Sequence, residues 1–437
     1  MTHSFFNGPL TYADRARRLT FYHFAELEIM EMLGGWSEGI VHVPLRHGFG
    51  YQMFTQACNV RDLRWALRNF KKIHHRHVGP TDEFVRLCER IWQTTDPLKR
   101  LVGLHRVLKP HLINAYEAHI AQTDANADAN SVRALRSCVL NHRHDVAWGA
   151  QMIEKLTADP RTRSEAGLWQ AELESDLVAS GGVTSEGFAY DLPESEFSVG
   201  YQSVADAPRR NGYTYVKKPQ PLPEGRAPMD KRFAYKDDIP SYIHPTFVKG
   251  TKDWLLQGVH DLWQGENITV DRCGRFICEF ASTPFEMRFD MAQQAWEEAR
   301  HIYIDSEIIQ LLGGTLGMYP LMVGNYSKWM DEPDPFVRMA FHNTVQEGNA
   351  AMNTGEWLSE CDSWVGNAVG SRLRHLAGDE IVHIGFGNNW LMQIHGDDAG
   401  YRRQVIDKVR QWMPIMFSQE DSDRWYRRLE GIYKLPA

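Results

Sequence analysis

The stretch WEEARHIYID at residues 296–305 places Glu298 and His301 one turn apart on the same side of a predicted helix. A helix packed into a core seldom carries a carboxylate there, because an unpaired buried charge costs several kcal/mol of desolvation. The same Glu-x-x-His pattern recurs at Glu380 and His383. This i,i+3 spacing lets both side chains of a pair converge on one cation. Two short matches decide little by themselves, so their distances to other carboxylates matter.

Two further glutamates lie at nearly equal distances before these pairs. Glu347 precedes Glu380 by 33 residues. Glu266 precedes Glu298 by 32 residues. In two antiparallel helices joined by a turn, such separations place both residues of a pair at one level. A carboxylate-bridged dimetal site in a four-helix bundle uses one Glu from each of two helices and a Glu-x-x-His from each of the other two. We therefore expect the metal ligands Glu266, Glu298, His301, Glu347, Glu380 and His383.

The residues around the expected ligands are apolar enough to form a core. On the helix of Glu298 the same face carries Met287, Met291 and Ile308. Four carboxylates and two imidazoles offer hard and borderline donors, which suit iron or manganese. We expect two Fe ions, with Mn/Fe and Mn2 pairs left open because the ligands alone do not separate the metals.

Charged and small residues beside the ligands suggest supporting roles. Glu297 and Asp379 each directly precede a ligand Glu, and such carboxylates can accept a hydrogen bond from a metal-bound His. Arg300 would balance the acidic cluster. Asp305 is a candidate for an extra ligand or a substrate contact, and Gly387 for the floor of a substrate cavity. Alternatively, Glu297, Asp379 and Arg300 are surface charges, Asp305 is a satisfied polar group near a helix end, and Gly387 permits close helix packing.

Composition divides the chain into four segments. A Pro-, Gly- and Ser-rich stretch without periodicity is too long for an ordinary connection, so it is a linker or a cover over a site. Helical patterns lie on both sides of it. We predict an N-terminal helical bundle at 1–180, the linker or cover at 181–250, a dimetal four-helix bundle at 251–396 and a helical extension at 397–437. The four core helices are expected at about 253–281, 284–312, 335–359 and 363–395.

Glycines and prolines mark several helix ends. Gly34-Gly35 is expected to end an early helix and Gly313-Gly314 the second core helix. Asp334-Pro335 is expected to begin the third core helix. Asn130-Ser131 is expected to cap a helix at 131–157.

The N-terminal half contains no Glu-x-x-His pair. Four residues there are candidate remnants of a second site: Glu26, Glu28, Glu117 and His144. They do not make a complete ligand set. We therefore expect a degenerate, metal-free bundle that supports the other one, dimerises or helps to shape a pocket.

Two segments resemble a known superfamily. PFEMRFDMAQQAWEEARH (284–301) and LAGDEIVHIGFGNNW (376–390) are similar to the second and fourth helices of ferritin-like diiron-carboxylate proteins, in particular bacterial ferritin-like proteins of unknown function. The resemblance covers 251–396 well and 20–160 weakly. It implies an all-α fold of two helical bundles, the C-terminal one ferritin-like. It also implies metal-ligand roles for the two Glu-x-x-His pairs and single-Glu ligand roles for Glu266 and Glu347.

Composition limits the partners. The net charge of −8 argues against nucleic acid, since phosphate binding needs a basic face. No apolar run approaches the roughly 20 residues of a membrane-spanning helix. The start of the chain lacks the charged-then-apolar order of a signal peptide. The six cysteines form no CxxC pair and are expected to be reduced. We therefore expect a cytoplasmic protein with neither nucleic-acid nor membrane partners.

The leading functional hypothesis is a non-haem dinuclear iron oxidase or oxygenase. It would use O2 as co-substrate, act on a small organic molecule and draw on an external electron donor. A homodimer is expected. The alternatives are a ferroxidase or iron-handling protein, which needs an acidic ion path, and a catalytically silent binding or scaffold bundle. The second bundle and the 181–250 segment favour the enzyme, because iron storage needs only one compact bundle.

Overall fold

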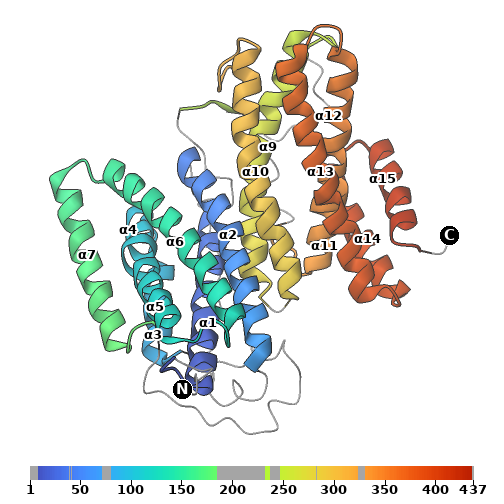
Figure 1. Cartoon of the computed structure of the whole chain (residues 1–437). Helices are drawn as coiled ribbons and strands as arrows, with labels where there is room; N and C mark the ends of the chain where they lie inside the picture. Colours follow the sequence, from blue (N-terminus) through green and yellow to red (C-terminus); the bar gives the residue numbers. More distant parts are fainter. Residues whose placement is uncertain are drawn as a thin grey trace. The chain divides into compact units, whose positions relative to one another are not determined.

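The computed structural model describes residues 8–38, 40, 42–70, 80–184, 232–236, 247–281, 283–322 and 330–435. These residues are helical almost throughout, which confirms the predicted all-α class (Figure 1). Strands β1 (Tyr235–Lys236) and β2 (Leu321–Met322) form a short parallel pair. The predicted linker or cover at 181–250 lies largely outside the described residues. Among the described helices, none combines the length and apolar character needed to cross a bilayer.

The chain divides into two compact units. The N-terminal unit contains Met1–Gly35 and Gln52–Lys218, and the C-terminal unit contains Trp36–Tyr51 and Pro219–Ala437. The C-terminal unit thus includes an early segment of the chain, which the sequence segments did not anticipate. The finer description as two bundles, one of them ferritin-like, stays a prediction.

The N-terminal unit is built from helices joined by short turns. Thr81 and Asp159 cap two of them by accepting hydrogen bonds from the backbone N–H groups of Phe84 and Thr162. The helices are α1 (Tyr12–Ser37), α2 (Val43–Leu67, shared with the C-terminal unit), η1 (Arg68–Phe70), α3 (Asp82–Gln93), α4 (Pro97–Val102), η3 (Gly103–Leu108), α5 (Lys109–Gln122), α6 (Ala129–Leu156) and α7 (Pro160–Ala179). Of these, η3 is a single turn of π-helix.

Two predicted helix ends in this unit are wrong. Helix α1 continues through Gly34-Gly35 to Ser37, because both glycines adopt helical backbone angles rather than the positive φ of a C-cap. Helix α6 begins at Ala129 and not at Ser131. Asp128 precedes it and accepts a hydrogen bond from the Ser131 hydroxyl at 2.5 Å.

The C-terminal unit contains the four predicted core helices. They are α9 (Lys252–Glu279), α10 (Phe285–Leu311), the continuous segment α11 (Pro335–Met339), η8 (Ala340–Gln346) and α12 (Glu347–Cys361), and α13 (Gly366–His395). Asp334 caps α11 by accepting from the Phe336 N–H at 2.9 Å, and Gly313 follows α10 with a φ of +72°, both as predicted. The predicted extension forms α14 (Ala399–Trp412), η9 (Met413–Ile415) and α15 (Gln419–Ile432).

The four core segments of the C-terminal unit pack lengthwise around shared side chains (Figure 1). At one end they enclose an apolar cluster that includes Leu255, Val259, Ile308, Trp357, Leu373 and Leu376. Segment η8 is a π-helix of seven residues and departs from the predicted regular helix. Such π-turns within α-helices occur frequently at functional sites.

Candidate metal centre

The structure brings all six predicted metal ligands together in the middle of the four core helices. Glu266 comes from α9, and Glu298 with His301 from α10. Glu347 is the first residue of α12 after the π-helix, while Glu380 and His383 lie on α13. All six side chains are buried. Metal binding by these residues stays a prediction.

Their ligand atoms form two overlapping sets. Within each set the atoms lie within 4.8 Å of one another. Glu298 and Glu380 belong to both sets, so two cations bound there would share these two carboxylates. The first set is Glu266, Glu298, His301 and Glu380, and the second is Glu298, Glu347, Glu380 and His383.

Several polar atoms inside the cluster have no hydrogen-bond partner in the described part of the chain. They are Glu266 Oε1, Glu298 Oε2 and His301 Nδ1. His301 Nδ1 lies 3.3 Å from Glu298 Oε2 and 3.6 Å from Glu266 Oε1. A buried group without a hydrogen bond is costly, and a cation between these atoms would remove that cost. The donor set and its unsatisfied atoms therefore fit a pair of divalent metal ions.

Acidic residues hold the outer nitrogens of both histidines in a crossed arrangement. Asp379 on α13 lies 3.0 Å from Nε2 of His301 on α10. Glu297 on α10 lies 2.9 Å from Nε2 of His383 on α13. Each Nδ1 consequently faces the carboxylate cluster, in the orientation that a metal ligand requires. Arg300 donates to Asp379 at 3.0 Å and so balances part of the acidic charge.

Burial opposes charge throughout the cluster. It raises the pKa of Glu266 well above its usual range, and the neighbouring Glu298 charge acts in the same direction. Burial likewise raises the pKa of Glu380, assisted by the charge of Glu347. Burial thus favours the protonated form of these two carboxyl groups.

The pKa values of the two histidines are raised although burial acts to lower them. Burial lowers the pKa of His301, but its hydrogen bond to Asp379 outweighs this and leaves the pKa well above its ordinary value. For His383, the charge of Glu298 overcomes burial in the same way. The pKa of Glu298 is correspondingly held well below its usual range despite burial, by the neighbouring Glu266 carboxyl group and by His383.

Asp305 and Gly387 lie close to the centre but outside the two ligand sets. The Asp305 side chain is fully buried, both of its oxygens lack hydrogen-bond partners in the described part of the chain, and burial raises its pKa well above 3.8. Gly387 packs closely against η8, because a Cβ added there would lie 2.6 Å from Thr344 Oγ1. This contact favours the helix-packing interpretation of Gly387 over a cavity floor.

Sequence reasoning missed three residues that adjoin the ligands. Gln294 Nε2 donates to Glu298 at 3.0 Å and to Glu347 at 2.9 Å. Asn343 in turn donates to Gln294 Oε1 at 2.6 Å. His342 Nε2 lies 2.6 Å from Glu347 Oε1. The position of Gln294, one turn before Glu298 on the same face, was the available signal for the first.

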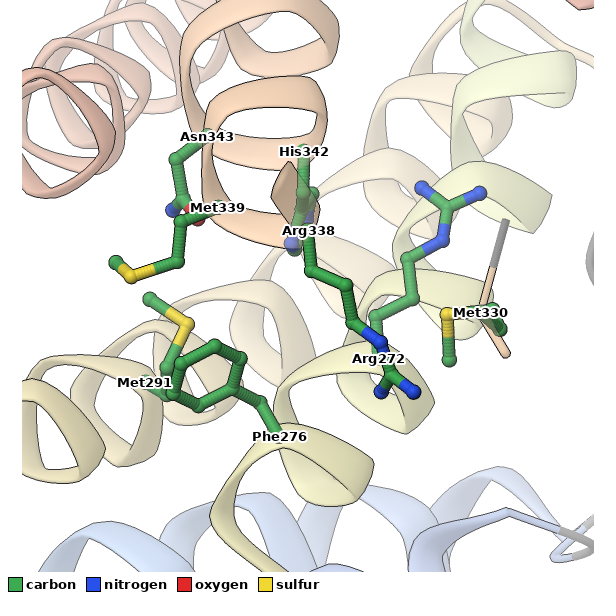
Figure 2. Close-up of a pocket in the computed structure, with 8 residues that line it drawn as sticks. All are labelled: Arg272, Phe276, Met291, Met330, Arg338, Met339, His342 and Asn343. Carbon is green, nitrogen blue, oxygen red and sulfur yellow. The ribbon is translucent and has the colours of Figure 1, made fainter. Parts of the chain in front are cut away.

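A small pocket opens against the same residues (Figure 2). His342 and Asn343 form part of its wall and connect it to the ligand cluster. Arg272 Nη1 donates to Gln346 Oε1 at 3.0 Å, and Arg338 pairs with Glu279. The lining consists of Arg272, Phe276, Met291, Met330, Arg338, Met339, His342 and Asn343.

Searches of protein-family models, of curated proteins and of solved structures found no match to this chain. The functional proposals therefore rest on the residues of the site and their geometry.

Proposed function

We propose that the C-terminal unit is a non-haem dinuclear iron enzyme that activates O2 to oxidise or oxygenate a small organic substrate. The observation that carries the proposal is the pair of overlapping ligand sets sharing Glu298 and Glu380. Carboxylate-bridged sites of this composition hold two metal ions in helical bundles. The chemistry that two iron ions would supply here is the activation of O2 for a two-electron oxidation.

The chain's own residues would prepare the centre. Asp379 and Glu297 fix the two imidazoles with Nδ1 toward the carboxylates. Gln294 holds Glu298 and Glu347 through its amide N–H groups, which limits their movement. Apolar helix faces around the cluster keep bulk water away. A pre-oriented ligand set of this kind binds metal without large rearrangement.

The lining of the pocket favours an organic substrate over an iron-transfer path, but the cavity itself measures about 10 Å³, the space of one water molecule, and would have to widen to admit a substrate. Its described lining holds no acidic residue, whereas a path for ferrous ions would need carboxylates. Three methionines and Phe276 offer an apolar surface, and two arginines add positive charge. Pockets for organic ligands combine an apolar wall with a few placed polar groups in this way. The connection from Asn343 through Gln294 to Glu298 brings this wall to the ligands.

Anaerobic loading with ferrous iron tests the proposal. We expect about two irons per chain, as the two ligand sets imply, and a change in the optical spectrum after mixing with O2. Glu298→Ala and His383→Ala should abolish the spectral change. Glu307→Ala is a matched control, since Glu307 lies on the same helix and pairs at the surface with Arg372. Metal binding that survives both ligand substitutions would overturn the proposal.

Repeated addition of iron separates the competing functions. A ferroxidase would oxidise many equivalents of ferrous iron per chain and release or store the product. The proposed enzyme would react with O2 once for each reduction of the centre. A silent scaffold would bind no metal, and its behaviour would be unchanged by Glu298→Ala.

A further inference from the structure

The N-terminal unit contains a buried polar cluster of its own, centred on Glu26. The Glu26 carboxylate accepts from Asn59 Nδ2 at 3.2 Å and lies 2.7 Å from His142 Nε2. Gln56 and Tyr116 also donate to it. Glu26 is fully buried, and its partners come from α2, α5 and α6.

Lys109 occupies the other half of this cluster. Its ammonium group donates to Asp145 Oδ2 at 2.6 Å and to Gln52 Oε1 at 2.8 Å. The exposed fraction of the Lys109 side chain is 0%. His105 Nε2 lies 2.9 Å from the same Gln52 oxygen. A fully buried lysine is rare unless it is paired, and here a buried carboxylate and an amide oxygen pair with it.

The spacing of the residues in this cluster follows that of the metal centre. Lys109 is the first residue after the π-helix η3, just as Glu347 is the first after the π-helix η8. Lys109 precedes His142 by 33 residues, and Glu347 precedes Glu380 by the same number. His142 is followed three residues later by Asp145, at the spacing of a Glu-x-x-His pair.

The first two helices of each unit repeat the correspondence. Glu26 precedes Gln56 by 30 residues, against 32 between Glu266 and Glu298. Asn59 follows Gln56 by three residues, where the metal centre has its histidine. Gln52 lies four residues before Gln56, as Gln294 does before Glu298.

Supporting contacts recur as well. Asn141, which directly precedes His142, donates to Asn59 Oδ1 at 2.8 Å. Asp379, which directly precedes Glu380, holds His301 in the corresponding way. Gly149 lies seven residues after His142 and packs against η3, since a Cβ there would lie 2.3 Å from the His105 ring. Gly387 lies seven residues after Glu380 and packs against η8.

The two clusters differ in where positive charge comes from. We propose that the N-terminal unit carries a second copy of the metal centre in which the Lys109 ammonium takes the place of the metal cations. Amides at Gln56 and Asn59 replace a carboxylate and an imidazole, so fewer negative charges need compensation. The Lys109 ammonium compensates Asp145 directly. This unit consequently keeps its buried carboxylates without any metal.

Restoring a carboxylate at position 109 tests the proposal inside the N-terminal unit. Lys109→Glu would be made in the full chain with Glu298→Ala, which removes a ligand common to both sets of the C-terminal centre. Cobalt(II) serves as the probe. We expect Lys109→Glu to retain about one cobalt per chain, with visible absorption typical of bound cobalt, because the new carboxylate, His142 and Asp145 would correspond to Glu347, Glu380 and His383 of the second ligand set. Lys109→Met in the same background should retain none. A folded Lys109→Glu variant without cobalt would overturn the proposal.

The opposite substitution, a lysine in place of Glu347 in the C-terminal unit, gives a second and independent test of the proposal. Glu347→Lys should fold in the presence of a chelator, bind no metal, and show a Tm that metal no longer raises. Glu347→Gln, its control, should keep the first ligand set and a metal-dependent Tm. Failure of Glu347→Lys to fold would overturn the proposal. This outcome decides the question even if Lys109→Glu also fails to fold. The inference uses the proposed metal centre as its reference, but cobalt retained in the Glu298→Ala background reports on the N-terminal unit alone.

Discussion

Both units bury carboxylates in their cores, but the two clusters differ in the positive charge that is available to offset them. In the N-terminal cluster, the Glu26 carboxylate accepts hydrogen bonds, and Asp145 Oδ2 pairs with the Lys109 ammonium. In the C-terminal cluster, four buried carboxylates face two imidazoles, and atoms of Glu266 and Glu298 lack hydrogen-bond partners within the described residues. Among the described residues, unsatisfied atoms also occur in the first cluster, at Gln56 Oε1, His142 Nδ1 and Asp145 Oδ1, but that cluster contains a lysine ammonium of its own. The second cluster has no lysine or arginine among its ligand residues, so bound cations would have to supply that positive charge.

The largest effect is expected from removing a carboxylate that belongs to both ligand sets, compared with removing one that belongs to a single set. Glu380→Ala should lose both metals, because Glu380 belongs to both ligand sets. Glu266→Ala should lose one metal, since Glu266 belongs to the first set alone. Iron per chain after anaerobic loading measures the difference. Equal losses in the two variants would contradict the bridging role of Glu380.

The next largest effect is expected in the N-terminal unit. Lys109→Met leaves the Asp145 carboxylate buried without its cation, and breaking a buried ion pair costs about 3–5 kcal/mol of unfolding free energy. The metal content should stay at the wild-type value. Chemical denaturation and metal analysis check the two parts.

Lys155→Met is the control for that substitution. Lys155 is an exposed residue near the end of α6, so its replacement should change stability by less than about 0.5 kcal/mol. Similar losses at both positions would mean that the Lys109 charge is not what stabilises the cluster.

A smaller effect is expected from the residues that orient the histidines. Asp379→Asn should weaken metal binding about 10–100-fold without abolishing it, as such supporting carboxylates do elsewhere. Asp362→Asn is the control, because Asp362 is exposed and lies just before α13, the helix of Asp379. It should leave the affinity for metal unaltered. Titration with a competing chelator gives the affinities. Complete loss of metal in Asp379→Asn would show that this residue acts as a ligand.

The smallest predicted effect concerns the glycines that face the π-helices. Gly387→Ala forces a Cβ within 2.6 Å of Thr344 Oγ1 and should cost about 1–3 kcal/mol through overpacking. Gly385→Ala, two residues away with nothing within 4 Å, should be neutral or stabilise by up to about 1 kcal/mol. Thermal unfolding of both variants measures the contrast. Equal Tm shifts would argue against tight packing between α13 and η8.

The sequence predicted the metal-centre framework because charged residues recur there at a fixed spacing. Glu266, Glu347 and the two Glu-x-x-His pairs meet as the half-helix distances required. His342 and Asn343 escaped prediction because η8 is a π-helix with i→i+5 hydrogen bonds. A reading based on 3.6 residues per turn does not place His342 beside Glu347.

The N-terminal cluster was harder to predict, because Lys109, Gln56 and Asn59 stand where the metal centre has carboxylates and an imidazole. Of the four candidate remnants, Glu26 alone lies in the cluster as described. Glu117 instead pairs with Arg143 at the surface, and His144 is largely exposed. The motif NHRH (141–144) contributes His142, not the His144 that we singled out. The correspondence between Lys109 and Glu347 is visible only in the structure, where each is the first residue after a π-helix.

Anomalous X-ray diffraction at the iron edge, from crystals of the full chain grown with ferrous iron under anaerobic conditions, tests the central claim most directly. We predict two adjacent peaks among Glu266, Glu298, Glu347 and Glu380, and no peak beside Lys109. An empty C-terminal cluster at saturating iron, or a peak at Lys109, would contradict the account.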